Sequence, residues 1–512
     1  MSRNFLSLFF CLLSCSVQSP KTILASPYPK RELRAVWIAT VDNIDWPSKK
    51  GLSSPEQQQE FTKILDSHQK TGLNAVFVQV RDAADAYYAK GQEPWSEWLT
   101  GEQGKAPEPF YDPLDFMIDE SHKRGLEFHA WLNLNRAVFK TATSITPTHI
   151  SKTKPEWILT YDGQKLLNFG IPEVRDYITE IVVNIVKNYD VDGIHFDDYF
   201  YPYAAAGQTL RDDTSFELYP NGFKNIEDWR RNNTDLLIKQ IADGIKAQKN
   251  YVKFGISPFG VWRNKREDQG GSDTFGHNSS YDNLFADTRK WVKLGWIDYI
   301  APQVYFNEGH KLIPYKNLVG WWAKNAFGRH LYIGQAAYRV LGDVKKGGWG
   351  DSLEMPNQLT YNRSLAAING SIFFSSKSIT SNPKSMQELL KTKFYKYPAL
   401  VPAMPWKDKI PPFSPINLEA NINETGAVVL TWEPPYPATD GERASYYVVY
   451  RFEKSDNISL EHPEHILTLT RNTNFTDLEA LPNKKYLYII TSVDRLHNES
   501  MASREVKVKT GS

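Results

Sequence analysis

The chain has 512 residues, more than one hydrophobic core usually holds, so two or more domains are expected. A formal net charge of +1 gives no indication of a nucleic-acid partner, and none is expected. The only two cysteines are Cys11 and Cys15, at the extreme N-terminus, which excludes a cysteine nucleophile and a cysteine-ligated zinc site from the folded body.

The N-terminus resembles a bacterial lipoprotein signal. Its apolar run, residues 5–13, is too short for a membrane-spanning helix but suits a secretory signal. The run ends in Leu12-Leu13-Ser14-Cys15, which is similar to a lipobox and implies lipidation of the Cys15 thiol. We therefore expect a signal peptide (1–15), a flexible tether (16–30) and a lipid anchor in the bacterial cell envelope, at the periplasmic or surface face of the outer membrane. An ordinary signal peptide cut elsewhere is the alternative.

From about residue 33 the sequence alternates between short apolar strands and amphipathic helices, which indicates parallel βαβ units. Eight such units predict a closed (β/α)8 TIM barrel over residues 31–390. A doubly wound open sheet is the alternative, but no glycine-rich phosphate loop follows the first strand. The expected strands are Arg34–Val41, Ala75–Arg81, Glu127–Asn133, Gly193–Tyr199, Lys253–Gly260, Tyr299–Tyr305, Leu331–Tyr338 and Ser371–Ser376.

Helix-boundary signals fall between these strands. Ser54-Pro55 predicts a capped helix start, and Gly72 a helix end. Asp112-Pro113 and Gly125 predict the bounds of a second helix. The longest connections all follow strands, where barrel enzymes place their sites: Asp82–Tyr111, Leu134–Gly170, Phe200–Asn225 and Val261–Asp282.

The C-terminal part reads as a separate β domain. Residues 391–412 are rich in proline and lysine and predict a linker, and short strands recur over residues 413–512. Trp432, and Leu481 five residues before Tyr486, resemble a fibronectin type III-like domain with its tyrosine corner. We expect this all-β sandwich to serve as a spacer or to dock to another envelope component.

The strongest chemical signal lies in the fourth barrel strand. Because side chains alternate along a strand, His195, Asp197 and Tyr199 share one face. A buried carboxylate is costly unless it is paired, liganded or working, so we favour a catalytic role for Asp197. Asp198 is compatible with either a catalytic or a structural role, and we interpret Asp192 as a structural residue at the start of the strand. The pattern is similar to glycoside hydrolase family 18, although that family has an acidic residue at the position of Tyr199.

Other strands end in polar and aromatic residues that converge on the same pocket. Such a set suits a polar ring-shaped ligand, with hydrogen-bonding groups and flat faces. Glycoside hydrolysis needs a second carboxyl group, and Glu93, beside Trp95, is the expected general acid, because apolar packing raises a carboxyl pKa. The expected substrate-binding residues are Arg81, Trp95, Trp131, Asn133, Arg136, His195, Tyr199, Trp262, Gln303 and Tyr305.

Together these stretches resemble the glycosyl-hydrolase-like 10 family of bacterial secreted proteins, over roughly residues 31 to 390. The matching motifs are Arg34-Ala35-Val36-Trp37, Gln79-Val80-Arg81, Glu93-Pro94-Trp95-Ser96, His129-Ala130-Trp131-Leu132-Asn133, residues 192–202, Gly255-Ile256-Ser257-Pro258-Phe259-Gly260, Pro302-Gln303-Val304-Tyr305 and Gly370-Ser371-Ile372-Phe373-Phe374-Ser375. The resemblance implies a barrel glycosidase, without a cofactor, acting on bacterial cell-wall glycan stripped of its peptides. Catalytic roles carry over to Glu93 and Asp197.

Three hypotheses follow. The first is glycoside hydrolysis, with Glu93 protonating the leaving oxygen, Asp197 acting as nucleophile or base, and Asp198 modulating its charge. The second is a metal-dependent deacetylase or hydrolase with His129, His195, Asp197 and Asp198 as ligands, although no His-x-His or His-Glu-x-x-His pair is present. The third is a non-catalytic glycan-binding lipoprotein.

Overall fold

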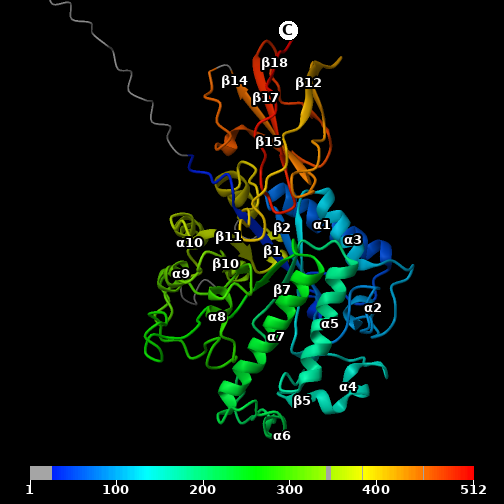
Figure 1. Cartoon of the computed structure of the whole chain (residues 1–512), viewed down its shortest axis with the longest axis vertical. Helices are drawn as coiled ribbons and strands as arrows, with labels where there is room; N and C mark the ends of the chain where they lie inside the picture. The colour runs from blue at the N-terminus through cyan, green and yellow to red at the C-terminus, as the bar shows by residue number, and fades with distance from the viewer. Residues whose placement is uncertain (1–25, 342–347, 383–384, 454, 512) are drawn as a thin grey trace, which may run out of the picture.

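The computed structural model describes residues 26–341, 348–382, 385–453 and 455–511; Cys15 lies outside them. Eight parallel strands close into a barrel surrounded by helices, which confirms the predicted TIM barrel (Figure 1). Around the barrel they run β1 (Leu33–Ile38), β11 (Ile368–Phe373), β10 (His330–Gln335), β9 (Tyr299–Ile300), β8 (Lys253–Ile256), β7 (Gly193–Phe196), β3 (Glu127–Leu132) and β2 (Ala75–Arg81).

The helices lie between successive strands and cover the outside of the barrel. The main ones are α1 (Ser54–Thr71), α3 (Pro113–Lys123), α5 (Pro172–Asn188), α7 (Ile226–Gln248), α8 (Thr288–Lys293), α9 (Tyr315–Lys324) and α10 (Glu354–Arg363). Shorter ones are α2 (Glu97–Thr100), α4 (Ile150–Thr153), α6 (Asp213–Leu218), α11 (Ser376–Thr380) and α12 (Met386–Leu389). Within the described ranges, none of the helices has the length and apolar character to span a bilayer.

Local sequence explains the start and end of α1. Its N-cap is Ser53, one residue earlier than expected, because Ser53 and Glu56 form a reciprocal capping box. The backbone N–H of Ser53 donates to the Glu56 carboxylate at 2.8 Å. Gly72 ends the helix with a φ of 89°, which an L side chain rarely adopts.

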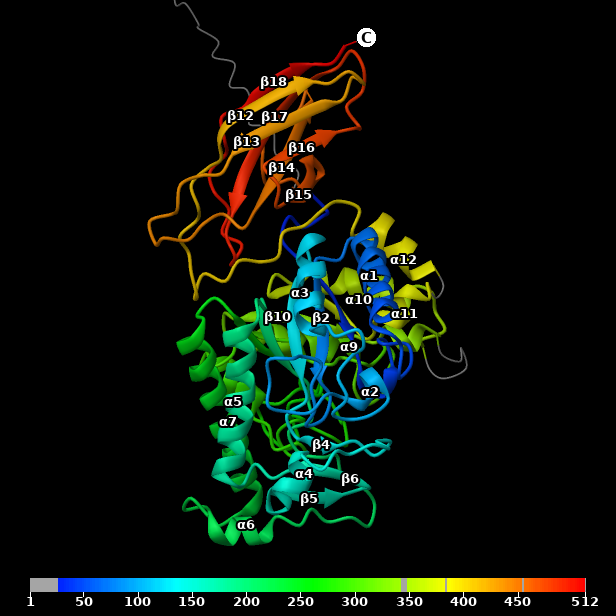
Figure 2. The ribbon, with the colours of Figure 1, turned by 90° about the vertical axis from the view of Figure 1, so that its right-hand side faces the viewer.

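The barrel strands lie where they were expected, but most are shorter at their C-terminal ends. The fourth strand was predicted to reach Tyr199, whereas β7 ends at Phe196. Asp197 and Asp198 therefore lie just beyond the hydrogen-bonded strand, at its C-terminal end. A small sheet made of β4 (Arg136–Val138), β6 (Gln164–Leu167) and β5 (Ile158–Tyr161) is inserted after β3 and projects from this end of the molecule (Figure 2).

The C-terminal region forms two antiparallel sheets that lie at the opposite end of the barrel from the inserted sheet (Figure 2). One has the order β12 (Ile416–Ile422), β13 (Val428–Glu433), β16 (Asn474–Asp477); the other β15 (Ile466–Thr470), β14 (Tyr446–Glu453), β17 (Lys485–Val493), β18 (Val506–Lys509). The backbone N–H of Leu481 donates to the Tyr486 hydroxyl at 3.1 Å. The fibronectin type III assignment stays a prediction.

The predicted linker packs closely against the barrel. Val401 and Met404 are buried in the apolar cluster inside the barrel, together with Leu33 and Ala35 at the start of β1. Trp406 and Lys407 both donate to the Asp298 carboxylate at 2.9 Å. Residues 401–407 therefore close the N-terminal end of the barrel, and we call this segment the barrel floor.

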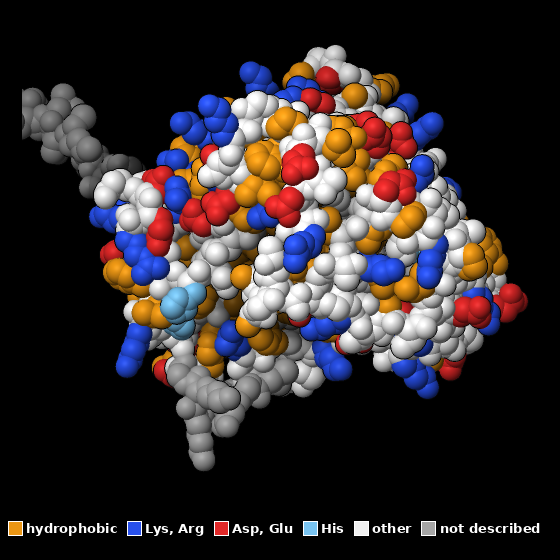
Figure 3. Space-filling view, turned by 90° about the horizontal axis from the view of Figure 1, so that it is seen from below, with side chains coloured by type: hydrophobic (Ala, Val, Ile, Leu, Met, Phe, Trp, Pro, Cys, Tyr) orange, Lys and Arg blue, Asp and Glu red, His pale blue; other side chains and the backbone are white. Residues whose placement is uncertain are grey.

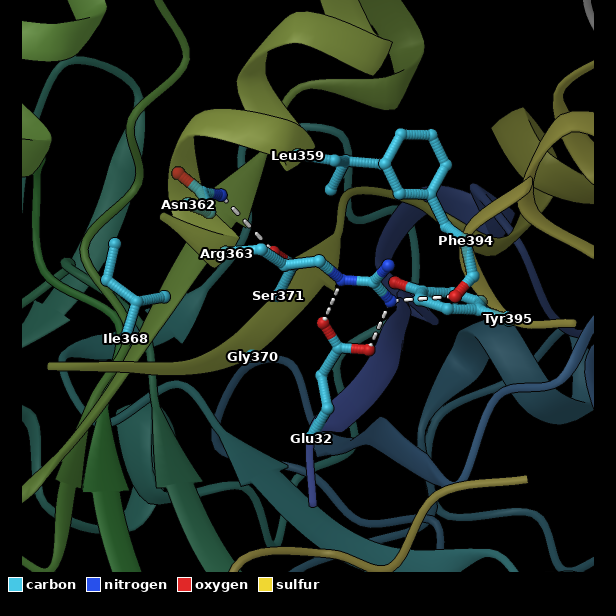
Figure 4. Close-up of a pocket in the computed structure, with 9 residues that line it drawn as sticks. All are labelled: Glu32, Leu359, Asn362, Arg363, Ile368, Gly370, Ser371, Phe394 and Tyr395. Carbon is cyan, nitrogen blue, oxygen red and sulfur yellow. Dashed lines mark hydrogen bonds and ion pairs between the residues drawn. The ribbon is translucent and has the colours of Figure 1, made fainter. Parts of the chain in front are cut away.

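A second ion pair closes the same end beside β1 and β11. Arg363, at the end of α10, donates two hydrogen bonds of 2.7 Å to the Glu32 carboxylate, and the facing groups are visible in Figure 4. The cavity beside them has a volume of about 20 Å³, room for about one water molecule, so this is a packing site rather than a ligand site.

Candidate active site

A cavity of about 290 Å³ opens at the C-terminal end of the barrel. It has the size range of a small-ligand pocket and the place where barrel enzymes hold their substrates. Figure 3 views the molecule from this end and shows Lys and Arg side chains interspersed with apolar and acidic ones. The lining comprises Trp37, Ala39, Val41, Ile44, Gln79, Trp131, Arg136, Phe139, Asp197, Tyr199, Ser257, Gln303, Tyr305, Tyr338 and Phe374.

Asp197 is the carboxyl group in this lining. Its Oδ2 accepts a hydrogen bond from the Trp131 indole at 3.1 Å, and both oxygens lie 3.2 Å from the Asn133 amide nitrogen. The backbone N–H of Tyr199 donates to Oδ1 at 3.3 Å. Burial raises the pKa of Asp197, and the charge of Arg136 opposes the rise. The carboxyl group is thus oriented by neutral donors, and no cationic side chain in the described part of the chain forms an ion pair with it.

Asp198 follows directly and is also held by neutral groups. The Tyr203 hydroxyl and the Gln303 amide both donate to it, the latter at 3.0 Å. Burial, reinforced by the charge of Asp197, raises the pKa of Asp198 to about 6. Two carboxyl groups with raised pKa values therefore lie side by side, and Gln303 connects the second to the cavity lining.

Five of the expected substrate-binding residues line this cavity: Trp131, Arg136, Tyr199, Gln303 and Tyr305. Arg136 lies over the Tyr199 ring, 5.0 Å from its centroid, and donates to the backbone oxygen of Asp82 at 3.0 Å. Asn133 is placed behind the lining, where it orients Asp197. Strand alternation had placed Trp131, Tyr199, Gln303 and Tyr305 on inward-facing positions, whereas Arg136 was expected from the family resemblance.

Glu93, the expected acid, and Arg81 lie outside this cavity and are bonded to each other. The Arg81 guanidinium donates to both Glu93 oxygens, at 2.7 and 2.8 Å, and Tyr177 donates to one of them at 2.9 Å. Burial raises the pKa of Glu93, and Arg81 opposes the rise. Both side chains are 1% exposed, and the Glu93 oxygens are occupied by Arg81 and Tyr177. Neither Glu93 nor Asp198 lines the cavity, but Asp198 is bonded to Gln303, which does.

Three further expected contacts also lie outside the cavity. His195 is fully buried in the barrel interior, below Trp37. Trp262 stacks on Trp321, with ring centroids 5.8 Å apart, and donates to Asp287. Trp95 packs edge-on against Phe110. The sequence pattern located their strands and loops correctly but not the direction in which these rings point.

The four residues considered as metal ligands do not converge. His129 and His195 both contact the Tyr299 hydroxyl, at 3.0 and 3.2 Å, while Asp197 and Asp198 lie above them at the cavity. Among the described residues, the grouping of potential ligand atoms lies far away, at Asp408, Glu442 and Asp494 beside the C-terminal sheets. These side chains do not support the deacetylase hypothesis.

Several lining residues were not expected, among them Trp37, Phe139, Tyr338 and Phe374. The position of Trp37 could have been predicted, because on β1 it shares the inward-facing parity of Leu33 and Ala35. Tyr338 and Phe374 follow strands that end before them, so periodicity gave no indication of their direction.

Comparison with known proteins finds relatives described as glycosyl hydrolases. The family model described as glycosyl hydrolase-like 10 matches residues 32–349. Glycosyl hydrolase YngK of Bacillus subtilis (strain 168) is 47% identical over 490 residues, 94% of this chain and 94% of the relative. Glycosyl hydrolase DigH of Escherichia coli (strain K12) is 39% identical over 402 residues, covering 72% and 90%. The solved glycoside hydrolase domain of PgaB (BpsB) from Bordetella bronchiseptica gives a TM-score of 0.44 at 14% identity, covering 71% of this chain and 99% of that one.

Proposed function

Because the chain belongs to the glycosyl hydrolase-like 10 family, we propose that it is a glycoside hydrolase whose reaction takes place at the cavity holding Asp197. The observation that carries the proposal is the adjacent pair Asp197 and Asp198, two buried carboxyl groups held by neutral donors and with raised pKa values. Glycosidic cleavage by two carboxyl groups needs one proton donor and one carboxylate.

The environments assign a role to each carboxyl group. Asp198, with a pKa near 6, holds a proton at mildly acidic pH and gives it to the leaving glycosidic oxygen. Asp197, oriented by Trp131 and Asn133, attacks the anomeric carbon or removes a proton from the attacking water. The glycosidic C–O bond breaks, the leaving oxygen keeps the proton from Asp198, and water supplies the hydroxyl group on the anomeric carbon. The second proton of that water replaces the one that Asp198 gave. Asp198 thereby takes the acid role that the sequence had suggested for Glu93.

The proposed substrate is peptide-free cell-wall glycan. Flat rings in the lining, such as Trp131 and Tyr305, suit sugar faces, and Gln303 and Arg136 supply hydrogen bonds to hydroxyl and acetamido groups. The relatives described as glycosyl hydrolases come from bacteria, whose walls contain such strands. The lipobox-like motif at Cys15 is consistent with an enzyme anchored in the cell envelope.

The test is release of short sugars from purified peptide-free glycan strands, followed by mass spectrometry. The parent protein is compared with Asp197→Asn and with Trp262→Phe, a matched aromatic variant outside the cavity. We expect Asp197→Asn to lose about 10²–10⁴-fold in kcat/KM and Trp262→Phe to stay within about twofold. No turnover by the parent on this and other bacterial glycans would favour a binding protein instead.

A further inference from the structure

A column of buried polar side chains runs through the barrel interior below the cavity. It begins at Trp37, whose ring lines the cavity. The indole N–H donates to Nε2 of His195 at 3.1 Å. An indole nitrogen can only donate, so Nε2 of His195 carries no proton and the proton of this buried, neutral imidazole is on Nδ1.

The same reasoning assigns the protons on Tyr299 and His129, the next two groups in the column. Nδ1 of His195 donates to the Tyr299 oxygen at 3.2 Å, so the Tyr299 hydroxyl donates to Nδ1 of His129 at 3.0 Å. The other nitrogen of His129 then donates to Glu127 at 3.2 Å. Each group has one arrangement that satisfies its neighbours, and all the donors point toward the Glu127 carboxylate.

Two strand glycines make room for the rings of this column. A Cβ at Gly193 would lie 2.3 Å from Nδ1 of His129, and one at Gly255 would lie 2.0 Å from the Tyr299 ring. His129 is further held by stacking on Phe77, with ring centroids 4.3 Å apart. The column is thus built into the packing of the strands.

The lower end of the column is completed by the C-terminal domain. Glu127 bonds Lys253 at the start of β8 and lies 2.5 Å from Nε2 of His497, which follows β17. Nε2 of His497 also lies 3.0 Å from the Lys253 ammonium, which can only donate, but its shorter contact with the Glu127 carboxylate, which can only accept, places the proton on Nε2. Nδ1 of His497 then accepts from Tyr446 at 2.9 Å. His497 is 5% exposed, so the contact is sealed from solvent.

We propose that Trp37 is a sugar-contacting residue and that His497 is a positioning residue acting on it through Glu127, His129, Tyr299 and His195. The C-terminal domain would then set the orientation of one wall of the glycan site. The proposal rests on the proposed function for its kinetic consequence, but not for the column itself. If the C-terminal domain only packed against the barrel, substitutions at His497 would not change the orientation of the Trp37 ring.

The experiment uses the purified protein with 15N-labelled tryptophan and follows the indole N–H signals by NMR, with the Trp37 signal assigned by its loss in Trp37→Phe. Tyr299→Phe removes both middle hydrogen bonds at nearly constant volume. His497→Leu removes the lower donor, whereas His497→Gln retains one. Arg495→Gln is the matched control, because Arg495 bonds Asp190 across the same interface outside the column, at 2.5 Å.

We expect the Trp37 signal to move in Tyr299→Phe and His497→Leu and to stay in place in His497→Gln and Arg495→Gln. On glycan, Tyr299→Phe is expected to raise KM about tenfold with little change in kcat, because a sugar-stacking ring contributes to ground-state and transition-state binding alike. An unmoved Trp37 signal in folded Tyr299→Phe overturns the column, and an unchanged KM overturns its role in binding. If the parent hydrolyses no glycan, the proposed function fails while the NMR measurement still decides the column.

Discussion

Both ends of the barrel bury carboxyl groups, but the groups are matched with different partners. At the cavity end, neutral amide, indole and hydroxyl donors hold Asp197 and Asp198, and burial raises both pKa values. At the other end, Glu127 bonds Lys253 and Asp192 bonds His122 at 2.7 Å. Burial opposes ionisation there too, but the neighbouring charges hold the pKa of Glu127 well below its usual range and lower that of Asp192 to about 2.

The identity of the partner therefore separates structural carboxyl groups from reactive ones. A carboxylate beside a cation stays ionised and holds two elements together. A carboxyl group held only by neutral donors can exchange a proton near neutral pH, as acid catalysis requires. Changing one group at each end tests this difference.

The largest effect on stability is expected for Glu127→Gln. Removing this carboxylate leaves the Lys253 ammonium, which is 2% exposed, without its charged partner. We expect the free energy of unfolding to fall by about 3–5 kcal/mol, measured by urea denaturation. Glu461→Gln, at an ion pair whose glutamate side chain is 83% exposed, is the control and should change it by less than about 0.5 kcal/mol. Equal effects of the two variants would contradict the proposed role of the ion pair.

Asp198→Asn is expected to raise the free energy of unfolding, the opposite of the effect of Glu127→Gln. The folded pKa of about 6 lies above the ordinary value, so the folded state loses stability as pH rises from about 4 to about 6 and stays less stable above that range. Asparagine cannot ionise, so we expect a gain of about 1–3 kcal/mol at pH 7 and almost none at pH 4. Thermal denaturation at both pH values measures it, and a gain of the same size at pH 4 would point to packing instead.

The pH dependence of hydrolysis tests the proposed role of Asp198 as the general acid. If Asp198 must be protonated, kcat/KM falls about tenfold per pH unit above pH 6. We expect this alkaline limb in the parent and in Trp262→Phe, and its absence from the residual activity of Asp198→Asn. An unchanged limb in Asp198→Asn would assign the proton to another group.

Glu93→Gln sharpens the comparison, because Glu93 lies near the cavity end and is paired with Arg81 as the carboxylates of the other end are paired with cations, yet burial raises its pKa whereas theirs are lowered. We expect the variant to unfold more easily, since Arg81 is left buried without its charged partner. For the folded protein, kcat/KM should stay within about threefold of the parent, measured after the folded fraction is determined. A loss of 100-fold or more would return Glu93 to the reaction.

The fold was predictable because strand and helix periodicities recur in every βα unit. Ala75–Arg81 was placed correctly at both ends, and the other barrel strands differed mainly where polar residues leave the ladder. The role of residues 399–407 was not predictable, because proline and lysine are typical of a linker whether or not the segment is covered. Burial of Met404 depends on contacts with β1, far away in the sequence.

The sequence could predict those site residues whose inward direction follows from the alternation of side chains along a strand. Strand alternation correctly placed three residues at the cavity, Asp197, Trp131 and Gln303, because each lies at an inward-facing position on or just after a strand. Glu93 lies in a connection without periodicity, where the sequence could not show that Arg81 would bind it. His195 was expected at the site by its inward-facing position, but the Trp37 indole, from β1 across the barrel, lies over it and donates to it.

The barrel floor has a consequence for synthesis of the protein. Val401 and Met404, which cover the lower ends of β1 and its neighbours, leave the ribosome after all eight strands. Until they do, the nascent barrel has a complete ring of strands and an open apolar end, a surface of the kind that chaperones bind. A segment translated after all eight strands therefore completes the core of the barrel, so folding of the barrel waits for residues 401–404.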